Sequence, residues 1–308
     1  MPKILPLNIW GTGLLMLPGV LGCRPLSQPP PMTQQSCESG DDFVWIEAGN
    51  YALGSDRTER DYAYRISAEA VATEVDKIDQ AETNLRRKGW FNREANRRVL
   101  ARSTVCMGKN LITNAEYHAF VRATGHRSPY ISANDYQKQG FLVHPYATVK
   151  SYLWQDQMFP SGEGQHPVVL VSYQDAQAFA QWRGQQDGHT YRLPTALEWE
   201  QTARGTEGRY FPWGNDWRAE ATNWANFGGL HTSAIATFPL SRSPDGVEDM
   251  AGNVFEYTST LTQSLRQKAV VLKGCSWDDL PGFCRAAYQH TRPLDSRHIL
   301  FGFRLVKE

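Results

Sequence analysis

The chain has 308 residues, with 32 basic and 32 acidic side chains and therefore a formal net charge of zero. A neutral chain has no long-range field to draw it to nucleic acid or to an anionic membrane surface, so neither partner is expected. Ten Trp, 13 Tyr and 13 Phe occur together with 25 Gly and 17 Pro. This composition predicts a loop-rich soluble fold whose core is filled by large rings.

Residues 1–23 are similar to an export signal. Lys3 is their only lysine, and residues 4–22 are apolar or small up to Cys23. The stretch has the length and polarity of a signal peptide, but it is too interrupted for a membrane-spanning helix. Residues 20–23 (VLGC) are similar to a bacterial lipobox, in which the cysteine is acylated and becomes the mature N-terminus. We therefore predict an exported bacterial lipoprotein, periplasmic or in the outer membrane, attached only through this lipid. An ordinary cleaved signal or a buried N-terminal strand are the alternatives.

Residues 24–41 are rich in Pro, Gln and Ser, which predicts a stiff, solvated tether between the anchor and a folded domain. Five cysteines occur in the chain. If Cys23 carries lipid, Cys37, Cys106, Cys275 and Cys284 remain, an even number that permits two disulfides in three possible pairings in an oxidising compartment. No CxxC motif and no Cys/His spacing indicates a zinc site.

The folded part begins with residues 42–54, whose apolar runs and turn residues predict a strand, a Gly-Asn turn and a second strand. After it, Val71, Val75, Ile78 and Leu85 recur at helical intervals and predict one amphipathic helix over residues 67–88. Basic residues cluster at its end, but neighbouring acidic residues neutralise them. The pattern is therefore typical of a solvated helix face rather than of a nucleic-acid surface.

Three later helix starts share a capping signal. Thr113, Ser172 and Thr195 each precede a carboxylate by three residues, which is the spacing of a capping box. Apolar residues behind these caps predict one buried face for each helix: Tyr117, Phe120 and Val121; Ala176, Phe179 and Ala180; Trp199 and Ala203. Gly125 and Gly205 are well placed to end the first and third of these helices.

Eight motifs occur in order from residue 42 to the C-terminus: FVWIEAGNYALGSD, TNAEYHAFVRATGH, HPVVLVSYQDAQAFAQW, YRLPTALEWEQTARG, FPWGNDW, DGVEDMAGNVFEYTS, VLKGCSW and FGFRLV. Together they resemble the formylglycine-generating enzyme (sulfatase-modifying factor) family. The resemblance implies one α+β domain over residues 42–308, with a C-type-lectin-like fold and sparse secondary structure. Family members include sulfatase-activating oxidases, siderophore-chromophore maturation proteins, sulfoxide synthases, a nitrite-reductase accessory protein and gliding-motility lipoproteins. Fold alone therefore does not settle the function.

The resemblance also implies a structural calcium ion. The family's ligands match Asp249, Gly252, Val254 and Glu256, with Asp249 replacing the usual Asn. Two carboxylates and converging main-chain carbonyls suit a hard cation. The alternative is that Glu256 caps a loop or forms a salt bridge.

Formylglycine generators oxidise their substrate with copper(I) bound by two cysteines, which follow a Gly-Gly-Ser-aromatic turn. Here Asp279 stands at the first cysteine's distance from the turn, and Cys284 stands at the second's only when counted from Ser276. Cys275 and Cys284 therefore have three interpretations: a disulfide, two unrelated core cysteines, or a displaced redox or copper site in which both are catalytic. Copper or iron is possible but is not supported by a standard ligand set.

Polar residues of the same segment match the family's substrate groove: Trp277, Asp278, Asp279, His290, Arg292 and Asp295. His290 is the candidate general base, although a lone histidine of this kind more often only hydrogen-bonds a loop. Arg304 is expected to pair with a buried acid.

The leading hypothesis is an exported, oxidoreductase-like family member that performs an oxidative maturation step on a peptide, a protein or a peptide-derived metabolite. The step would be of the siderophore-chromophore or nitrite-reductase accessory type. A non-catalytic, lectin-like binding or assembly lipoprotein is the alternative from another class. A sulfatase-activating oxidase with rearranged cysteines is the third.

Overall fold

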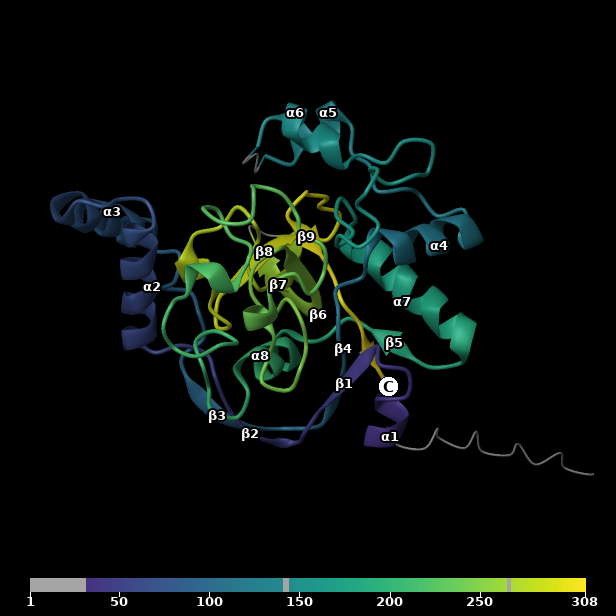
Figure 1. The fold of residues 1–308 in the computed structure, drawn as a ribbon, viewed down its shortest axis with the longest axis horizontal. Coiled ribbons are helices and arrows are strands. Elements are labelled where there is room, and N and C mark those ends of the chain that lie inside the picture. Colours follow the sequence, from purple (N-terminus) through teal and green to yellow (C-terminus); the bar gives the residue numbers. More distant parts are fainter. Residues whose placement is uncertain (1–31, 141–143, 265–266) are drawn as a thin grey trace, which may run out of the picture. The chain divides into compact units, whose positions relative to one another are not determined.

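The computed structural model describes residues 32–140, 144–264 and 267–308, and residues 32–308 form a single unit (Figure 1). The predicted signal peptide, the lipobox with Cys23 and the first part of the predicted tether lie outside the described residues. Within the described part of the chain, none of the helices is both long enough and apolar enough to cross a membrane.

Three small sheets organise the described part of the chain. The first has the order β1 (Phe43–Ile46), β4 (Val105–Gly108), β10 (Val306–Lys307) and β5 (Tyr191–Arg192). The second pairs β2 (Gly49–Leu53) with β3 (Arg98–Arg102). The third has the order β8 (Gln289–Pro293), β7 (Gln267–Lys273), β6 (Phe255–Ser264) and β9 (Phe301–Gly302). In the third sheet, β9 pairs in parallel with β6.

The strand, turn and strand predicted for residues 42–54 imply that the two strands pair with each other, and this is wrong. Both strands exist, but β1 pairs with β4 and β2 pairs with β3, so they belong to different sheets. Gly49 and Asn50 lie inside β2 rather than in a turn. An apolar run predicts a strand but not its partner, and here the partners are distant in the sequence.

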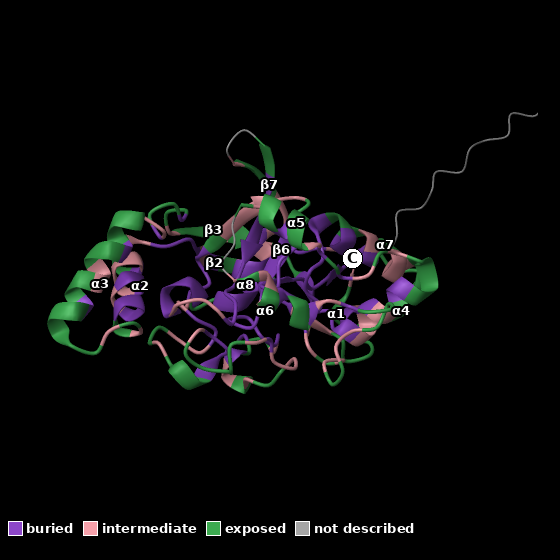
Figure 2. Cartoon of the chain, turned by 90° about the horizontal axis from the view of Figure 1, so that it is seen from above, coloured by how far each residue is buried: buried purple, intermediate pink, exposed green. Residues whose placement is uncertain are grey.

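Helices surround the third sheet. The α-helices are α1 (Gln34–Cys37), α2 (Arg57–Glu69), α3 (Val75–Lys88), α4 (Asn114–Thr124), α5 (Ala133–Lys138), α6 (Tyr146–Val149), α7 (Tyr173–Asp187) and α8 (Ala196–Arg204). Short 3-10 turns are η1 (Lys150–Tyr152), η2 (Ala219–Ala221), η3 (Pro239–Ser241) and η4 (Pro281–Cys284). In two perpendicular views, α2 and α3 lie on one side of the molecule and α4 and α7 on the other (Figures 1 and 2).

The capping predictions are confirmed. Thr113, Ser172 and Thr195 are the N-caps of α4, α7 and α8, and each forms a complete capping box. Gly125 ends α4 with a left-handed φ of 69°, and Gly205 ends α8. All the apolar residues predicted to form the inner faces of these helices are buried. These signals worked because they are local in the sequence.

The single helix predicted over residues 67–88 is wrong. The chain forms α2 and α3 with a break between them. Ile78 and Leu85 are buried as expected, but Val71 and Val75 are 56% and 66% exposed. The apolar periodicity therefore ran across a helix end, and most of α3 faces solvent (Figure 2).

The last part of the predicted tether is folded. Residues 34–37 form α1, and Cys37 is bonded to Cys106 of β4 with a Cα–Cα distance of 5.6 Å. Lys307 donates a hydrogen bond from Nζ to the Ser36 carbonyl at 2.9 Å. The Pro- and Ser-rich composition predicted a solvated tether here. Composition carries no information about the disulfide that fixes Cys37.

Large rings fill the core, as the composition predicted. Tyr117 stacks on Phe179 at 5.8 Å between α4 and α7, and both meet Phe303 edge-on. Trp199 of α8 is fully buried. The α+β prediction is confirmed. Arg304 pairs with the buried Glu256 at 2.6 Å, also as expected.

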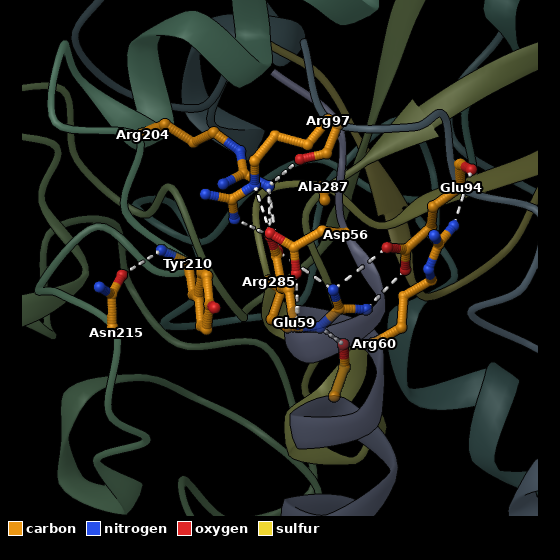
Figure 3. A network of polar contacts seen from close by, with 12 residues as sticks. Asp56, Glu59, Arg60, Glu94, Arg97, Arg204, Tyr210, Asn215, Arg285 and Ala287 are labelled. Carbon is orange, nitrogen blue, oxygen red and sulfur yellow. Dashed lines mark hydrogen bonds and ion pairs between the residues drawn. The ribbon is translucent and has the colours of Figure 1, made fainter. Parts of the chain in front are cut away.

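A buried charge network fastens α2 to the rest of the unit (Figure 3). Glu59 of α2 is fully buried and accepts from Arg97, Arg204 and Arg285 at 2.5, 3.0 and 3.1 Å. Arg285 also pairs with Glu94 at 2.5 Å. Buried ions are tolerated only when each charge is compensated, and this mutual compensation fixes Arg285 and the η4 turn before it.

Candidate functional site

The turn predicted to carry the reaction centre contains a disulfide. Cys275 and Cys284 are bonded, with a Cα–Cα distance of 4.7 Å, and both are fully buried. The disulfide interpretation is therefore confirmed, and the interpretation as unrelated core cysteines is wrong. A disulfide offers no thiolate pair for copper(I).

Asp279, which the sequence analysis placed at the first cysteine's distance from the turn, closes the same turn. Its Oδ2 accepts from the Ser276 backbone N–H at 2.8 Å and from the Ser276 hydroxyl. Burial raises the pKa of Asp279 to about 6, and the bonds from Ser276 oppose this shift. Asp279 is therefore a turn-stabilising acid rather than a soft metal ligand.

The disulfide is held by close backbone packing against α2. The Gly282 N–H donates to Ser67 Oγ at 2.9 Å. A Cβ on Gly282 would lie 2.5 Å from the Ala63 carbonyl oxygen, so only glycine permits this approach. Since Arg285 is anchored to Glu59 and Glu94, both ends of η4 are fixed.

A cavity of about 770 Å³ lies beside this turn. It is bounded by the end of α3 and the loop after it, η4, β8 and parts of β6 and β9. Its aromatic lining consists of Trp90, Phe255, Phe283, Tyr288, His290, His298 and Phe301. Its charged lining consists of Lys88, Arg93, Glu94, Asp278, Asp279 and Arg292. Rings combined with charges of both signs suit an amphipathic ligand such as a peptide.

Four residues predicted to line a groove do line this cavity: Asp278, Asp279, His290 and Arg292. Two do not. Trp277 is 1% exposed and packs between Tyr152 and His144, at ring distances of 6.3 and 5.0 Å. Asp295 lines another pocket, with Arg127 and Tyr130. The motif alone did not show which side of the chain faces the cavity.

His290 is unsuited to act as a general base. Burial lowers its pKa to about 3, so the ring is neutral near pH 7 and accepts a proton weakly. The ring stacks on Phe255 at 5.0 Å, and Nδ1 lies 3.3 Å from the Tyr288 hydroxyl. The structure thus gives His290 a packing and hydrogen-bonding position in the cavity wall.

The sequence analysis did not identify Trp90 and Phe283 as site residues. They are distant in the sequence, yet their ring centroids lie 5.1 Å apart. Lys88 lies over the Trp90 ring at 4.4 Å. The region before them was interpreted as a plain solvated helix. The available signal was the Gly-Trp pair after the helix, because a large ring after a helix-ending glycine is rarely left in solvent.

The residues matched to the calcium site fit an ion only in part. Burial raises the pKa of Asp249 to about 6, which marks a carboxylate whose charge is poorly compensated. Asp249 Oδ2 accepts from the Ala236 N–H at 2.8 Å. Both oxygens of Glu256, however, accept from Arg304, and the Gly252 carbonyl accepts from Val254 N–H at 2.9 Å. Glu256 therefore has the salt bridge that the sequence analysis gave as the alternative.

Comparison with known proteins shows the family of the chain. The Sulfatase-modifying factor enzyme 1-like domain matches residues 28–308. The chain belongs to this family. The predicted resemblance to formylglycine-generating enzymes is thus confirmed across nearly the whole chain.

The relatives within the family have different names. "Inactive C-alpha-formylglycine-generating enzyme 2" of Bos taurus is 38% identical over 39% of this chain and 44% of its own length. "Hercynine oxygenase" of Mycolicibacterium smegmatis is 27% identical over 65% of this chain and 52% of its own length. The match therefore spans about half the length of these relatives. The solved structure of PvdO from Pseudomonas aeruginosa has a TM-score of 0.61 at 20% identity, covering 86% of this chain and 94% of that chain. This last likeness shows the fold.

Proposed function

We propose that this family member binds a peptide or a peptide-derived small molecule in the cavity beside η4, without cysteine-based oxidase chemistry. The observation that carries the proposal is the buried Cys275–Cys284 disulfide in the cavity's supporting turn. It removes both thiols that a copper-thiolate centre requires. The lectin-like binding alternative of the sequence analysis is thereby preferred over a sulfatase activator.

The cavity has the properties of a recognition site. Its volume of about 770 Å³ lies within the range of small-molecule sites, which is roughly 300–1,000 Å³. Trp90, Phe283 and Tyr288 form a cluster of rings in the cavity lining, with the Phe283 and Tyr288 centroids 4.8 Å apart. Lys88 and Asp278 supply opposite charges at the lining. A short peptide offers matching aromatic, cationic and anionic groups.

A binding assay with a panel of short aromatic and charged peptides tests the proposal. Trp90→Ala should weaken the binding of any active peptide by about tenfold or more, because ring burial contributes on the order of 1.5–3 kcal/mol. Tyr130→Ala is the matched control, since Tyr130 is an exposed ring that lines a different pocket. No binding by any peptide, or equal loss in both variants, would refute the proposal. A cysteine-type sulfatase peptide should remain unconverted with copper; its conversion would also refute it.

A second candidate is the oxidative maturation step of the sequence analysis, performed by a rearranged centre. The identity to hercynine oxygenase over 65% of this chain favours it. Peptide-dependent oxygen consumption that requires copper or iron and is lost in Asp279→Asn would support this candidate. A protein that binds peptide but consumes no oxygen with either metal would exclude it.

We also propose that the protein acts outside the cytoplasm. The disulfides Cys37–Cys106 and Cys275–Cys284 support this, because such bonds persist in oxidising compartments. Attachment through Cys23 is part of the proposal and lies outside the described residues. Fatty-acid labelling of the cellular protein tests it: Cys23→Ser should abolish labelling, and an unlabelled wild type would exclude the anchor.

Calcium stays a proposal, centred on Asp249. Burial raises the pKa of this carboxyl, and a dication there would stabilise its ionised form. Saturating calcium at about 100 times its dissociation constant should then stabilise the fold by about 2.7 kcal/mol relative to chelator. An identical unfolding midpoint with calcium and with chelator would exclude the site.

A further inference from the structure

Three metal-ligating side chains converge outside the cavity, in loops distant from one another in the sequence. One ligand atom from each of Glu163, His166 and His231 lies within 4.8 Å of the other two. Glu163 and His166 belong to the segment between η1 and α7, and His231 belongs to the segment between η2 and η3. Neither the cavity lining nor the residues matched to calcium include any of them.

The spacing suits coordination. His231 Nε2 lies 3.5 Å from Glu163 Oε1. Two ligands about 2.0–2.1 Å from a tetrahedral ion are about 3.4 Å apart, so this pair already has the separation that an ion imposes. A ligand atom of His166 lies within 4.8 Å of one ligand atom from each of these two side chains.

Contacts with Thr232 orient the two histidine rings. His166 Nδ1 lies 3.0 Å from Thr232 Oγ1. His231 Nδ1 lies 3.1 Å from the Thr232 carbonyl oxygen and 3.2 Å from Thr232 Oγ1. Each ring is therefore held through Nδ1, which leaves its Nε2 for a ligand. Metal-binding histidines are oriented in this way by an acceptor on the second nitrogen.

The backbone on both sides of the cluster is fixed as well. Asn114, the first residue of α4, donates from Nδ2 to the Glu163 carbonyl and from its N–H to the His166 carbonyl, both at 2.9 Å. Asn223 Nδ2 donates to the His231 carbonyl at 2.8 Å. Tyr152 stacks on the His231 ring at 4.3 Å with an interplanar angle of 8°. The cluster is thus held in place by the fold before any ion binds.

We propose that Glu163, His166 and His231 bind one divalent transition-metal ion of the zinc or iron(II) class. Two imidazoles and one carboxylate are the ligand set of catalytic zinc sites and of non-haem iron(II) sites. The side chains of Glu163 and His231 are 19% and 31% exposed, so the ion has access from solvent and keeps a coordination position for water or a substrate.

The electrostatics of the empty cluster agree with this assignment. Burial raises the pKa of Glu163, and the nearby His231 opposes that shift. Burial and His231 lower the pKa of His166. A neutral imidazole is the form that binds metal, and a divalent ion beside Glu163 would stabilise the ionised carboxylate. This inference is independent of the peptide-binding proposal.

Titration calorimetry of the untagged, oxidised full chain with Zn²⁺ tests the proposal, with Co²⁺ absorption as the second readout. The wild type should bind one ion, and the Co²⁺ complex should show the intense visible bands of a low-coordinate site. His231→Ala and Glu163→Gln should each weaken Zn²⁺ binding more than tenfold. Thr232→Val should weaken it by about 10–100-fold, because it removes the hydroxyl that orients both rings. Anaerobic titration with Fe²⁺ shows which ion binds more tightly.

His189→Ala is the matched control, because His189 is an exposed histidine outside the cluster, and it should leave binding unchanged. Circular dichroism of each variant establishes that it is folded. Absence of a one-to-one Zn²⁺ or Fe²⁺ complex would overturn the proposal. So would undiminished Zn²⁺ binding in folded His231→Ala and Glu163→Gln, whatever the result for His189→Ala.

Discussion

The two disulfides fasten the chain in different ways. Cys37–Cys106 joins residues 69 apart in the sequence, and the short helix α1 also accepts a hydrogen bond from Lys307 at the Ser36 carbonyl. Cys275–Cys284 spans only nine positions, and its second cysteine is followed directly by Arg285 with its buried ion pairs. The first disulfide is therefore the covalent attachment of its segment. The segment of the second disulfide is also held by the ion pairs of Arg285. The consequence that belongs to this disulfide alone is that two cysteines near the cavity have no free thiol.

The largest expected effect comes from Arg285, because it tests the network that supports the second disulfide. Arg285→Met leaves Glu59 and Glu94 buried with less compensation and should lower the free energy of unfolding by about 3–5 kcal/mol. Urea unfolding measures this. Arg65→Met removes exposed ion pairs from the same helix α2 and should lower it by less than about 1 kcal/mol. Equal effects of the two variants would show that the buried network adds nothing to the disulfide.

The next largest effect is expected for the first disulfide. Cys37→Ser with Cys106→Ser releases a loop of about 70 residues, and chain entropy then predicts a loss of about 4 kcal/mol. Urea unfolding and protection of α1 from proteolysis are the measurements. Peptide binding in the cavity should be unchanged. A loss below about 1 kcal/mol would mean that α1 is held mainly by other contacts.

The second disulfide should matter less for stability. Cys275→Ser with Cys284→Ser opens a short loop, for which chain entropy predicts no more than about 3 kcal/mol. Arg285 still holds the end of η4, so the fold should remain cooperative. Thiol counting under denaturation provides the direct check on the wild type, which should show no reactive thiol at either position. A larger loss than for the first pair would reverse the comparison.

The sequence was informative wherever a signal is local. Thr113, Ser172 and Thr195 were identified as caps because hydroxyl and carboxylate stand three residues apart. Arg304 was expected to find a buried acid because a guanidinium within an apolar motif needs one, and Glu256 is that acid. The order of the motifs predicted the family and the α+β fold for the same reason, because each motif is a short run of residues that can be read directly from the sequence.

Long-range features were not accessible in this way. The partner of β1, the pairing of Cys37 with Cys106 and the burial of Trp277 depend on which segments meet in space. The cluster around His231 was also missed, because a search for Cys/His spacing detects ligands that are close in the sequence. Glu163 and His231 are brought together only by the packing of two loops.

The smallest effect concerns Asp279, the buried acid that closes the turn at Ser276. Burial raises the pKa of Asp279 to about 6, Asp278 adds to this shift, and Ser276 and Arg292 oppose it. A raised folded-state pKa means that the protonated form is favoured in the fold. The resulting stability is complete below the unfolded pKa near 4 and is lost as the pH rises to about 6. Asp279→Asn keeps an acceptor for Ser276 without the charge.

Asp279→Asn should therefore match the wild type near pH 4 and exceed it above pH 6, by about 1–2 kcal/mol after allowing for partial solvent screening. Urea unfolding at both pH values measures the difference. Burial also raises the pKa of Asp249 to about 6, so only the difference between variant and wild type isolates Asp279. Asp295→Asn, in another pocket, controls for the loss of a charge. If both variants gain equally, the effect belongs to net charge. If only Asp279→Asn gains, the hydrogen bonds from Ser276 stabilise the turn while the buried charge of Asp279 lowers the stability of the fold.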